Sequence, residues 1–396
     1  MKACMLAYTF YETDNRVRRY AEALSGRGDS VEVISLKRDD SQPDEEVVNG
    51  VKVFRIQTRV INERGKLPHL LRHLAFLVKS SFFLIKKSIM SPYDIIHVHS
   101  VPDFEVFAAW FPKCLGTKII LDLHEIVPEF YAEKFEVSER SVIFRALKLI
   151  EKASARFADH VIIVNHLLEE RLISRSVSKE KCNTFINYPG GALFTVSQKK
   201  PEKSDRFVMI YPGSLNWHQG LDIAIKAFYL VKDRLPDAEF HIYGEGSAQP
   251  ELEGLIRELD FSARVFLKGT RTSSEIARVM AMADLGVVPK RADSYGNLAF
   301  STKIFEFMAL GVPVVVSDTR IDKYYFNDSN VKFFRSGDEQ SLAEAIFDLA
   351  KNPEARKRMA ENGYRHAAAN NWDVKKHDYL SLVDRLAGEG CREEAQ

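Results

Sequence analysis

Short runs of apolar residues alternate with helical patterns over the first 190 residues. Buried parallel strands are continuous apolar runs of this kind, and each needs a crossover, usually a helix, to reach the next strand. The predicted strands are residues 3–8, 31–36, 51–56, 94–99, 118–123 and 161–164. Asp14 offers a capping side chain for a predicted helix over residues 16–25. The pattern therefore predicts βαβ units and a parallel sheet.

The alternation stops at residues 187–206 and then restarts. Residues 197–206 are polar and rich in Lys and Ser, which is typical of a linker. Further strands are predicted at residues 207–211, 239–243, 265–268, 285–288, 312–316 and 331–334. We therefore predict two doubly wound Rossmann-like domains, 1–190 and 200–371, that face a central cleft, with a last helix in 372–396 that joins the first domain. Ligands of open parallel sheets bind at the carboxyl ends of the strands, so the cleft is the expected site.

Composition narrows the class of protein. The chain has 396 residues, with 56 Lys and Arg against 55 Asp and Glu, so no global field favours nucleic acid as a partner. The four cysteines are scattered, which argues against a zinc site or a disulfide framework and favours the cytoplasm. No apolar segment reaches the roughly 18 residues that a spanning helix needs.

The densest candidate chemistry lies in residues 287–316. Ser301 and Thr302 stand where a helix is predicted to begin, and the positive end of a helix binds phosphate readily. Lys303 adds a full charge, and Glu306 follows almost one turn later on the same face, where its carboxylate can accept two ribose hydroxyls. The spacing alone fits equally an ordinary helix cap with a carboxylate in the first turn.

Several motifs resemble those of the retaining GT-B glycosyltransferases of family 4. The segment from Glu306 to Pro313 resembles the end of the family's Glu-x7-Glu signature. The loop 211–220 resembles the loop that opens the donor domain, and residues 266–269 resemble the strand beside the nucleotide base. Residues 93–99 and 122–125 resemble the histidine motifs of the acceptor domain. The resemblance extends over essentially the whole chain.

The resemblance implies transfer of a hexosyl group from a UDP- or GDP-sugar to a hydroxyl, with retained anomeric configuration and without a metal or other cofactor. The acceptor would be a lipid-linked saccharide in cell-envelope or exopolysaccharide biosynthesis. The expected catalytic residues are His124, Asn297 and Lys303. The expected donor-binding residues are Gly213, Ser214, Asn216, Gly269, Lys290, Arg291, Leu298, Ser301, Thr302 and Glu306. Arg16 and His99 are expected to bind the acceptor.

Three positions depart from the family pattern. The first Glu of the signature is Leu298 here, which cannot hydrogen-bond a sugar. Ser214 and Gln219 replace the Arg and the Lys that hold the donor diphosphate in the family. We expect Lys290, Arg291 and Lys303 to supply that charge, with hydrogen bonds from Asn216 and His218. The departures keep two other functions open, a nucleotide-sugar epimerase of the same architecture and a non-catalytic protein that binds nucleotide sugars.

Two histidine motifs lie at predicted strand ends. His124 follows a strand at the functional edge of a parallel sheet, although an isolated histidine there is often structural. His97 and His99 point the same way from one strand, and a metal pair would need a third ligand that the sequence does not make obvious. We expect His99 to line the acceptor cleft and His97 to lie in the core.

Residues 67–90 combine Leu, Phe and Ile with four basic residues and no acidic one. A basic amphipathic helix of this kind binds anionic membrane surfaces. The alternative is a helix that packs on the sheet with a solvated basic edge. The protein is expected to be cytoplasmic and peripheral at the inner face of the cell membrane.

Overall fold

The structure, a computed structural model, describes all residues except 60–65, 135–136, 139, 191–193, 195–205 and 389–396. The chain forms two compact units, Met1–Asn187 with Lys376–Gln396, and Tyr188–Lys375. The division therefore falls at residues 187 and 376, near the predicted limits of 190 and 372. The predicted linker 197–206 lies outside the described residues except for Arg206.

The first unit is built on an eight-stranded sheet with the order β3-β4-β2-β1-β5-β6-β7-β8. Its strands are β1 (Lys2–Ala7), β2 (Ser30–Lys37), β3 (Glu45–Val48), β4 (Val51–Thr58), β5 (Ile95–Ser100), β6 (Lys118–Leu123), β7 (His160–Ile163) and β8 (Cys182–Thr184). All pairs are parallel except β3 with β4. The predicted apolar runs correspond to β1, β2, β4, β5, β6 and β7, whereas the antiparallel β3 and the parallel edge strand β8 were not predicted. β3 is mostly exposed, so it carries no buried apolar run.

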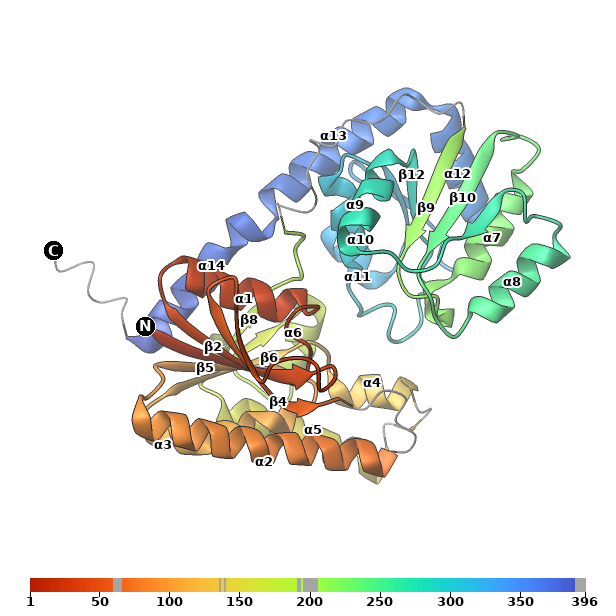
Figure 1. Ribbon diagram of the computed structural model, residues 1–396. Coiled ribbons are helices and arrows are strands. Elements are labelled where there is room, and N and C mark those ends of the chain that lie inside the picture. The colour runs from red at the N-terminus through yellow and green to blue at the C-terminus, as the bar shows by residue number, and fades with distance from the viewer. Residues whose placement is uncertain (60–65, 135–136, 139, 191–193, 195–205, 389–396) are drawn as a thin grey trace. The chain divides into compact units, whose positions relative to one another are not determined.

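Helices cover both faces of this sheet (Figure 1). They are α1 (Asn15–Gly26), α2 (Lys66–Met90), η1 (Asp103–Ala109), α3 (Trp110–Cys114), α4 (Val127–Lys134), α5 (Val142–Phe157), α6 (His166–Ile173), η2 (Lys179–Lys181) and the C-terminal α14 (Trp372–Ala387). α2, α3 and α5 lie against one face, and α1 lies against the other (Figure 1). Tyr379 of α14 is fully buried, packs on Tyr20 and lies 3.0 Å from Nδ1 of His97. The last helix thus forms part of the core of the first unit.

The second unit has a six-stranded parallel sheet with the order β11-β10-β9-β12-β13-β14. Its strands are β9 (Phe207–Pro212), β10 (Ala238–Tyr243), β11 (Val265–Leu267), β12 (Leu285–Val288), β13 (Val314–Ser317) and β14 (Lys332–Phe334). Its helices are η3 (Trp217–Gln219), α7 (Leu221–Leu230), α8 (Gln249–Glu258), α9 (Ser273–Met282), α10 (Thr302–Ala309), α11 (Arg320–Tyr325), α12 (Glu339–Lys351) and α13 (Pro353–Ala369). α7 ends at Leu230, six residues before the helix-breaking Pro236.

The strand order fixes where each sheet can bind a ligand. The direction of winding reverses between β1 and β5 in the first unit and between β9 and β12 in the second. Crevices at the carboxyl ends of strands beside such a reversal are the usual ligand sites of doubly wound sheets. In the second unit Gly286 of β12 lets Phe307 of α10 pack closely, because a Cβ on Gly286 would come within 2.7 Å of the ring. This contact fixes α10 against the sheet near the reversal.

Candidate functional site

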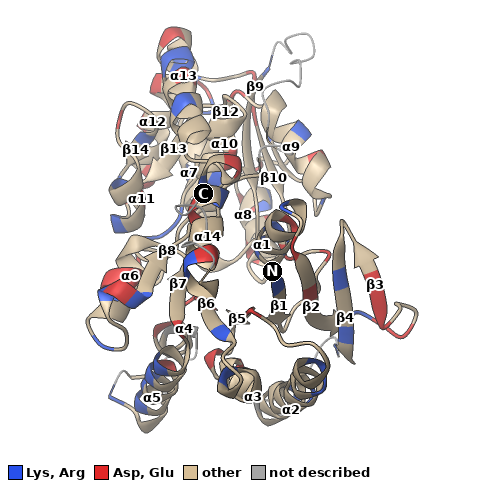
Figure 2. Ribbon diagram, turned by 90° about the vertical axis from the view of Figure 1, so that its left-hand side faces the viewer, with Lys and Arg blue, Asp and Glu red and all other residues tan. Residues whose placement is uncertain are grey.

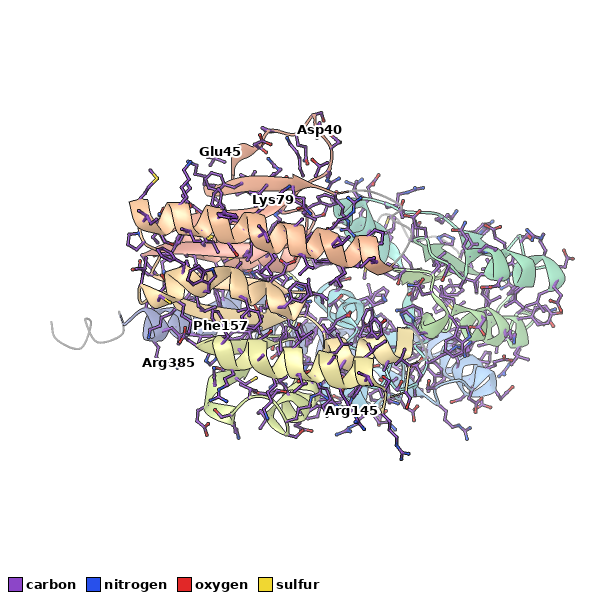
Figure 3. The ribbon with its side chains drawn as sticks, turned by 90° about the horizontal axis from the view of Figure 1, so that it is seen from below. Asp40, Glu45, Lys79, Arg145, Phe157 and Arg385 are labelled. Atoms are coloured by element: carbon purple, nitrogen blue, oxygen red, sulfur yellow. The ribbon has the colours of Figure 1, made fainter. Side chains whose placement is uncertain are left out.

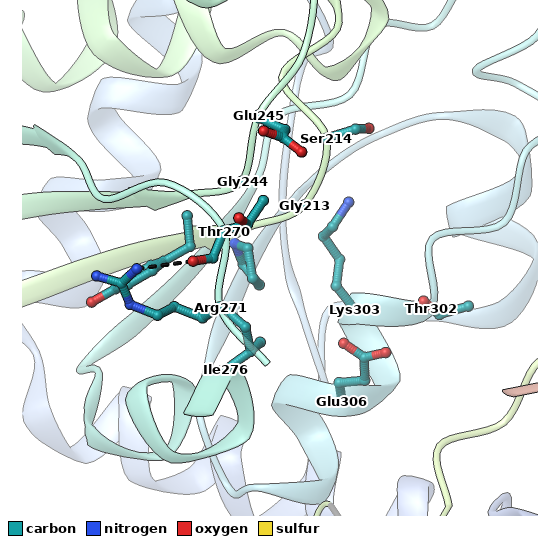
Figure 4. A pocket seen from close by; sticks show the side chains of 12 residues that line it. Gly213, Ser214, Gly244, Glu245, Thr270, Arg271, Ile276, Thr302, Lys303 and Glu306 are labelled. Atoms are coloured by element: carbon teal, nitrogen blue, oxygen red, sulfur yellow. Dashed lines mark hydrogen bonds between the residues drawn. The ribbon is translucent and has the colours of Figure 1, made fainter. Parts of the chain in front are cut away.

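A pocket of about 490 Å³ lies at the carboxyl ends of β9, β10 and β11, beside the start of α10 (Figure 4). Its volume is in the range of small-molecule sites. The lining residues are Pro212, Gly213, Ser214, Tyr243, Gly244, Glu245, Thr270, Arg271, Ile276, Thr302, Lys303 and Glu306. Four of the predicted donor-binding residues, Gly213, Ser214, Thr302 and Glu306, therefore meet here from two segments about 90 residues apart. Lys303, which was predicted to be catalytic, lies with them.

Two glycines allow the loops of the pocket to approach each other. Gly213 has a φ of +145°, and a Cβ there would lie 3.0 Å from Cε and Nζ of Lys303. Gly244 has a φ of +132°, and a Cβ there would lie 1.9 Å from the carbonyl oxygen of Gly213. Backbone in this region strains any residue with a side chain. Glycine at position 213 thus leaves room for the Lys303 ammonium, and glycine at position 244 lets the loop after β10 approach the backbone of Gly213.

Two cations line the pocket, Arg271 and Lys303. The Nζ atom of Lys303 lies 3.4 Å from Oε1 of Gln219 and 4.8 Å from the ring centre of Tyr211. Burial, with a smaller effect from Lys290, lowers the pKa of Lys303 to about 8, although Glu306 acts in the opposite direction. The ammonium is therefore mostly protonated at pH 7. The Lys303 ammonium lies beside Gln219, at the position where the resembling family carries a lysine. The helix α10 therefore supplies the positive charge that the loop 211–220 lacks.

The first turn of α10 completes the polar side of the pocket. Ser301 is the N-cap, buried and without a capping hydrogen bond from its side chain. Thr302 follows at the positive end of the helix dipole. Figure 4 shows Lys303 and Glu306 extending from this helix into the pocket, with Lys303 directed toward Gly213 and Ser214. An ammonium and a carboxylate thus stand about one turn apart on one wall.

The other two predicted cations do not line this pocket. Lys290 is buried, pairs with Asp322 at 3.0 Å and donates to the carbonyl oxygen of Ala299. Arg291 makes two hydrogen bonds to Asp222, at 2.8 and 2.6 Å, and stacks on Trp217. Their charges are therefore neutralised within the protein. Both residues hold loops after β12, and Lys303 alone of the three brings its charge to the described pocket.

The predicted sugar-side residues lie in the loop between β12 and α10. The Asn297 amide donates to the carbonyl oxygens of Ala292 and Asp293, and its oxygen accepts from the backbone N–H of Arg320. These contacts fix the loop that also carries Leu298. Neither Asn297 nor Leu298 is among the residues that line the pocket.

Asn216 and Gly269 lie in neighbouring loops. The Oδ1 atom of Asn216 accepts from the Ser247 hydroxyl at 3.3 Å. Gly269 follows β11 with a φ of +65°, and its carbonyl oxygen accepts from Gly244 N–H at 2.9 Å. Gly269 therefore shapes the wall formed by Thr270, while Asn216 lies outside the lining of the pocket.

A second polar cluster surrounds Asp122 at the carboxyl end of β6. Arg16 donates to both carboxylate oxygens of Asp122 at 2.7 Å, and to Phe185 and Asn187. Burial alone would raise the pKa of Asp122, but the Arg16 guanidinium and hydrogen bonds from His124 and His99 hold that pKa well below its usual range. Arg16, predicted to bind the acceptor, is buried and carries out an internal role as the partner of Asp122.

The histidines form a chain from the core toward the surface. His97 and His99 stack at 4.2 Å and are both buried, and burial lowers the pKa of each. His99 lies 3.1 Å from Asp122, and His124 lies 3.4 Å from the same oxygen with 24% of its side chain exposed. His97 thus lies in the core as expected. His99, expected to line the acceptor cleft, lies behind His124.

Asp122 lies beside His97 and His99 and could serve as the third ligand of a metal ion. The sequence alone did not reveal this third ligand. The ligand atoms of the three residues lie within 4.8 Å of one another. Arg16, however, already donates to both oxygens of Asp122, and Nδ1 of His97 faces the Tyr379 hydroxyl. The contacts therefore favour an internal ion-pair network over a metal centre.

Sequence reasoning missed a group at the β1–β5 reversal of the first sheet. The His73 ring of α2 packs on the Tyr8 ring with ring centres 3.9 Å apart and ring planes tilted by 39°, and its Nδ1 lies 3.1 Å from Glu105. Burial raises the pKa of Glu105 well above its usual value. Nε2 of His73 lies 3.3 Å from Nε2 of His69, one turn earlier. The i, i+4 spacing of the two histidines was the only signal in the sequence.

The comparisons with known families cover both units. Residues 13–187 match the family described as "Glycosyl transferase 4-like domain", and residues 194–366 match "Glycosyl transferases group 1". Alpha-D-kanosaminyltransferase of Streptomyces kanamyceticus is 22% identical over 94% of this chain and 97% of its own. A D-inositol 3-phosphate glycosyltransferase of Pseudarthrobacter chlorophenolicus is 24% identical over 94% and 90%.

Solved structures share the fold over nearly the full length. Sucrose-phosphate synthase from Thermosynechococcus elongatus aligns with a TM-score of 0.77 at 19% identity, covering 98% of this chain and 99% of its own. Anabaena HepE in complex with UDP aligns with a TM-score of 0.71 at 18% identity, covering 97% and 100%. The chain thus carries a glycosyl transferase 4-like domain followed by a group 1 domain on the GT-B fold. Its class is that of the group 1 glycosyltransferases.

Proposed function

We propose that the protein transfers a hexosyl group from a nucleoside-diphosphate sugar, UDP- or GDP-linked, to a hydroxyl acceptor with retained anomeric configuration. The observation that carries the proposal is the pocket in which Lys303 and Glu306 of α10 meet the Gly213–Ser214 loop. Support comes from the structures of Anabaena HepE, which were solved with UDP and with UDP-glucose. Those ligands belong to a protein of the same fold.

In this proposal the diphosphate binds at the start of α10. The Lys303 ammonium and the positive helix end attract its oxygens, and Thr302 adds a hydroxyl donor. Glu306, one turn further, accepts the ribose hydroxyls. Gly269, Thr270 and Ile276 form the side that would receive the base. Ser214 adds a small polar group beside Lys303, where the resembling family places a larger cation.

The reaction breaks the bond between the anomeric carbon and the diphosphate oxygen and forms a bond from that carbon to the acceptor oxygen. The acceptor proton leaves with the nucleoside diphosphate. Negative charge grows on the leaving diphosphate, and prearranged cations and helix ends are strong stabilisers of such charge. Lys303 fills this role, and His124 with Asn297 remain the proposed residues for the transferred sugar. The proposal requires neither a metal nor another cofactor.

We propose that the acceptor binds the first unit. A saccharide of cell-envelope or exopolysaccharide biosynthesis, lipid-linked or free, is the proposed class. WaaG, a glycosyltransferase of lipopolysaccharide biosynthesis, shares the fold at a TM-score of 0.66. His99 and His124 lie at one end of the neighbouring strands β5 and β6. Arg16 would act on the acceptor only through Asp122 and its histidines.

The lipid-linked form of the acceptor is consistent with residues 67–90, which we propose to lie on the anionic inner face of the cell membrane. None of the described helices has the length and apolarity to cross a membrane. Charge reversal of Lys79 and Lys86 should release the protein from anionic vesicles. Lys87 is unsuitable for this test, because it pairs with Glu32 at 3.2 Å and lies over the Phe54 ring.

A donor panel tests the proposed activity. The purified protein is incubated with UDP- and GDP-hexoses, with and without saccharide acceptors, and the release of nucleoside diphosphate and the sugar products are measured. The proposal expects release that depends on the acceptor and is lost in Glu306→Ala. An epimer formed from the donor alone would instead identify an epimerase. Nucleotide binding without any turnover would identify a non-catalytic protein that binds nucleotide sugars. Leu298, Ser214 and Gln219, which depart from the family pattern, are the reason to test this alternative.

A further inference from the structure

The helix α2 carries large apolar side chains on the face turned away from the protein. Its most exposed apolar residues, between 52% and 75% exposed, are Leu67, Leu71, Val78, Phe82, Ile89 and Met90. The face toward the protein buries Phe76 and Leu84. It also buries Ser80 and Ser88, whose hydroxyls have no hydrogen-bond partner among the described residues. A helix that packs only on a sheet carries polar residues on its outward face, so the exposed apolar residues indicate a second apolar environment outside the protein.

The helix α5 also exposes large apolar side chains. Val142 is 81% exposed and Leu149 is 68% exposed. The inward face of α5 buries Phe144, Ser154 and Ala155, together with Glu151, which pairs with Arg175. α5 was not singled out by its sequence, because periodicity does not show which face of a helix points inward.

The two helices belong to one surface, which we call the α2–α3–α5 face. α2 packs on η1 and α3, and α5 packs on η1. Figure 3 shows α2, with Lys79, and α5, with Arg145, running across this side of the unit with a shorter helical segment between them. Trp110, which begins α3, is 50% exposed, and Leu115 just after α3 is 52% exposed. Fourteen of the 22 exposed large apolar side chains in the described residues lie on this face.

The charge of the face is of one sign. α2 contains no acidic residue, and the only acid of α5 is the buried Glu151 (Figure 2). The basic residues of the two helices are Lys66, Arg72, Lys79, Lys86, Lys87, Arg145, Lys148, Lys152 and Arg156. Lysines among apolar side chains complement an anionic lipid surface. A second copy of the chain fits less well, because two such faces would oppose like charges.

We propose that the whole α2–α3–α5 face lies on an anionic bilayer, with α5 and Trp110 as anchors beyond residues 67–90. This inference rests on the membrane contact of α2 in the proposed function and adds α5 as a second helix in contact with the membrane. α2, about 37 Å long, and α5 lie in the plane of the membrane. Two such anchors hold the first unit in one orientation, whereas a single helix would let it roll about the helix axis.

Vesicle co-sedimentation of the full chain tests α5 directly. The vesicles are phosphatidylcholine with 30 mol% phosphatidylglycerol, and the variant K148E/K152E leaves α2 intact. We expect the partition coefficient to fall at least about 30-fold, since each basic residue near such a surface contributes about 1 kcal/mol. The matched control is K357E/R358E on α13, two exposed cations of the second unit with the same change in charge. Binding of K148E/K152E equal to that of the control would overturn the inference.

Two further measurements separate this inference from the membrane contact of α2. If K79E/K86E is released while K148E/K152E stays bound, α5 is no anchor and only the contact of residues 67–90 stands. If the wild-type protein binds no vesicles, both are overturned. In Trp217→Phe, Trp110 is the remaining exposed tryptophan, and its fluorescence should shift to the blue on vesicle addition. No shift, or the same shift when Trp110→Phe is added, would contradict insertion of this face. Unchanged nucleotide affinity shows that the variants are folded.

Discussion

Replacement of Lys303 by Met should weaken the binding of a nucleoside diphosphate in a pH-dependent way. A hydrogen bond from an ammonium to a phosphate oxygen contributes about 1.5–3 kcal/mol, so the variant should bind about 10- to 150-fold more weakly at pH 7. Burial lowers the pKa of Lys303 to about 8 in the free protein. The diphosphate prefers the charged ammonium, and the phosphates are fully ionised above pH 7. Wild-type affinity should therefore fall as pH rises above 8, by up to about tenfold per pH unit.

Calorimetric titration of UDP and GDP at pH 7, 8 and 9 measures this effect. Wild-type affinity should approach that of Lys303→Met as pH rises. Lys303→Arg is the matched control, because a guanidinium stays charged over this range and its affinity should not depend on pH. Wild-type affinity that is constant from pH 7 to 9, or normal binding by Lys303→Met, would refute the assignment of Lys303 to the diphosphate.

The remaining predictions concern the ribose, the sugar and the buried ion pair. Glu306→Ala should weaken UDP, GDP and their sugars alike, about 10- to 150-fold by titration, because all carry the ribose; loss confined to the sugars would contradict this. His124→Ala should lower turnover far more than nucleotide affinity in a steady-state assay, and activity within about threefold of wild type would make His124 structural. Asp122→Asn leaves the buried Arg16 without its charge partner and should cost about 3–5 kcal/mol in urea unfolding. The wild-type pKa of Asp122 is depressed, so its contribution should be present above about pH 4 and be lost as pH falls below that value; equal stability of variant and wild type at pH 7 would contradict the pairing.

The apolar pattern was sufficient to predict both sheets. Buried runs such as Lys118–Leu123 lie as strands where the sequence placed them. The exposed edge strand β3 and the three-residue strand β8 were not predicted, because neither contains a buried apolar run of useful length.

Residue spacing predicted the candidate site only where neighbours in sequence are neighbours in space, and Gly213 and Ser214 were predicted from the family resemblance instead. Thr302, Lys303 and Glu306 share one helix turn, so their common wall follows from spacing. Lys290 and Arg291 looked equally available, and only the fold reveals that Asp322 and Asp222 neutralise them.

The network around Asp122 could not be predicted from the sequence for a similar reason. Arg16 is 106 residues away from Asp122, and the contact of His97 with Tyr379 spans 282 residues. Pairings of this length depend on the order of strands in the sheet, which the local pattern does not specify.

The central claim is that the pocket beside α10 holds the diphosphate of the donor. The most direct measurement is a crystal structure of the protein soaked with UDP or GDP. The account predicts diphosphate oxygens within hydrogen-bond distance of Lys303 Nζ and the start of α10, and ribose hydroxyls on Glu306. A nucleotide bound elsewhere, with Lys303 and Glu306 both uncontacted, would contradict the account.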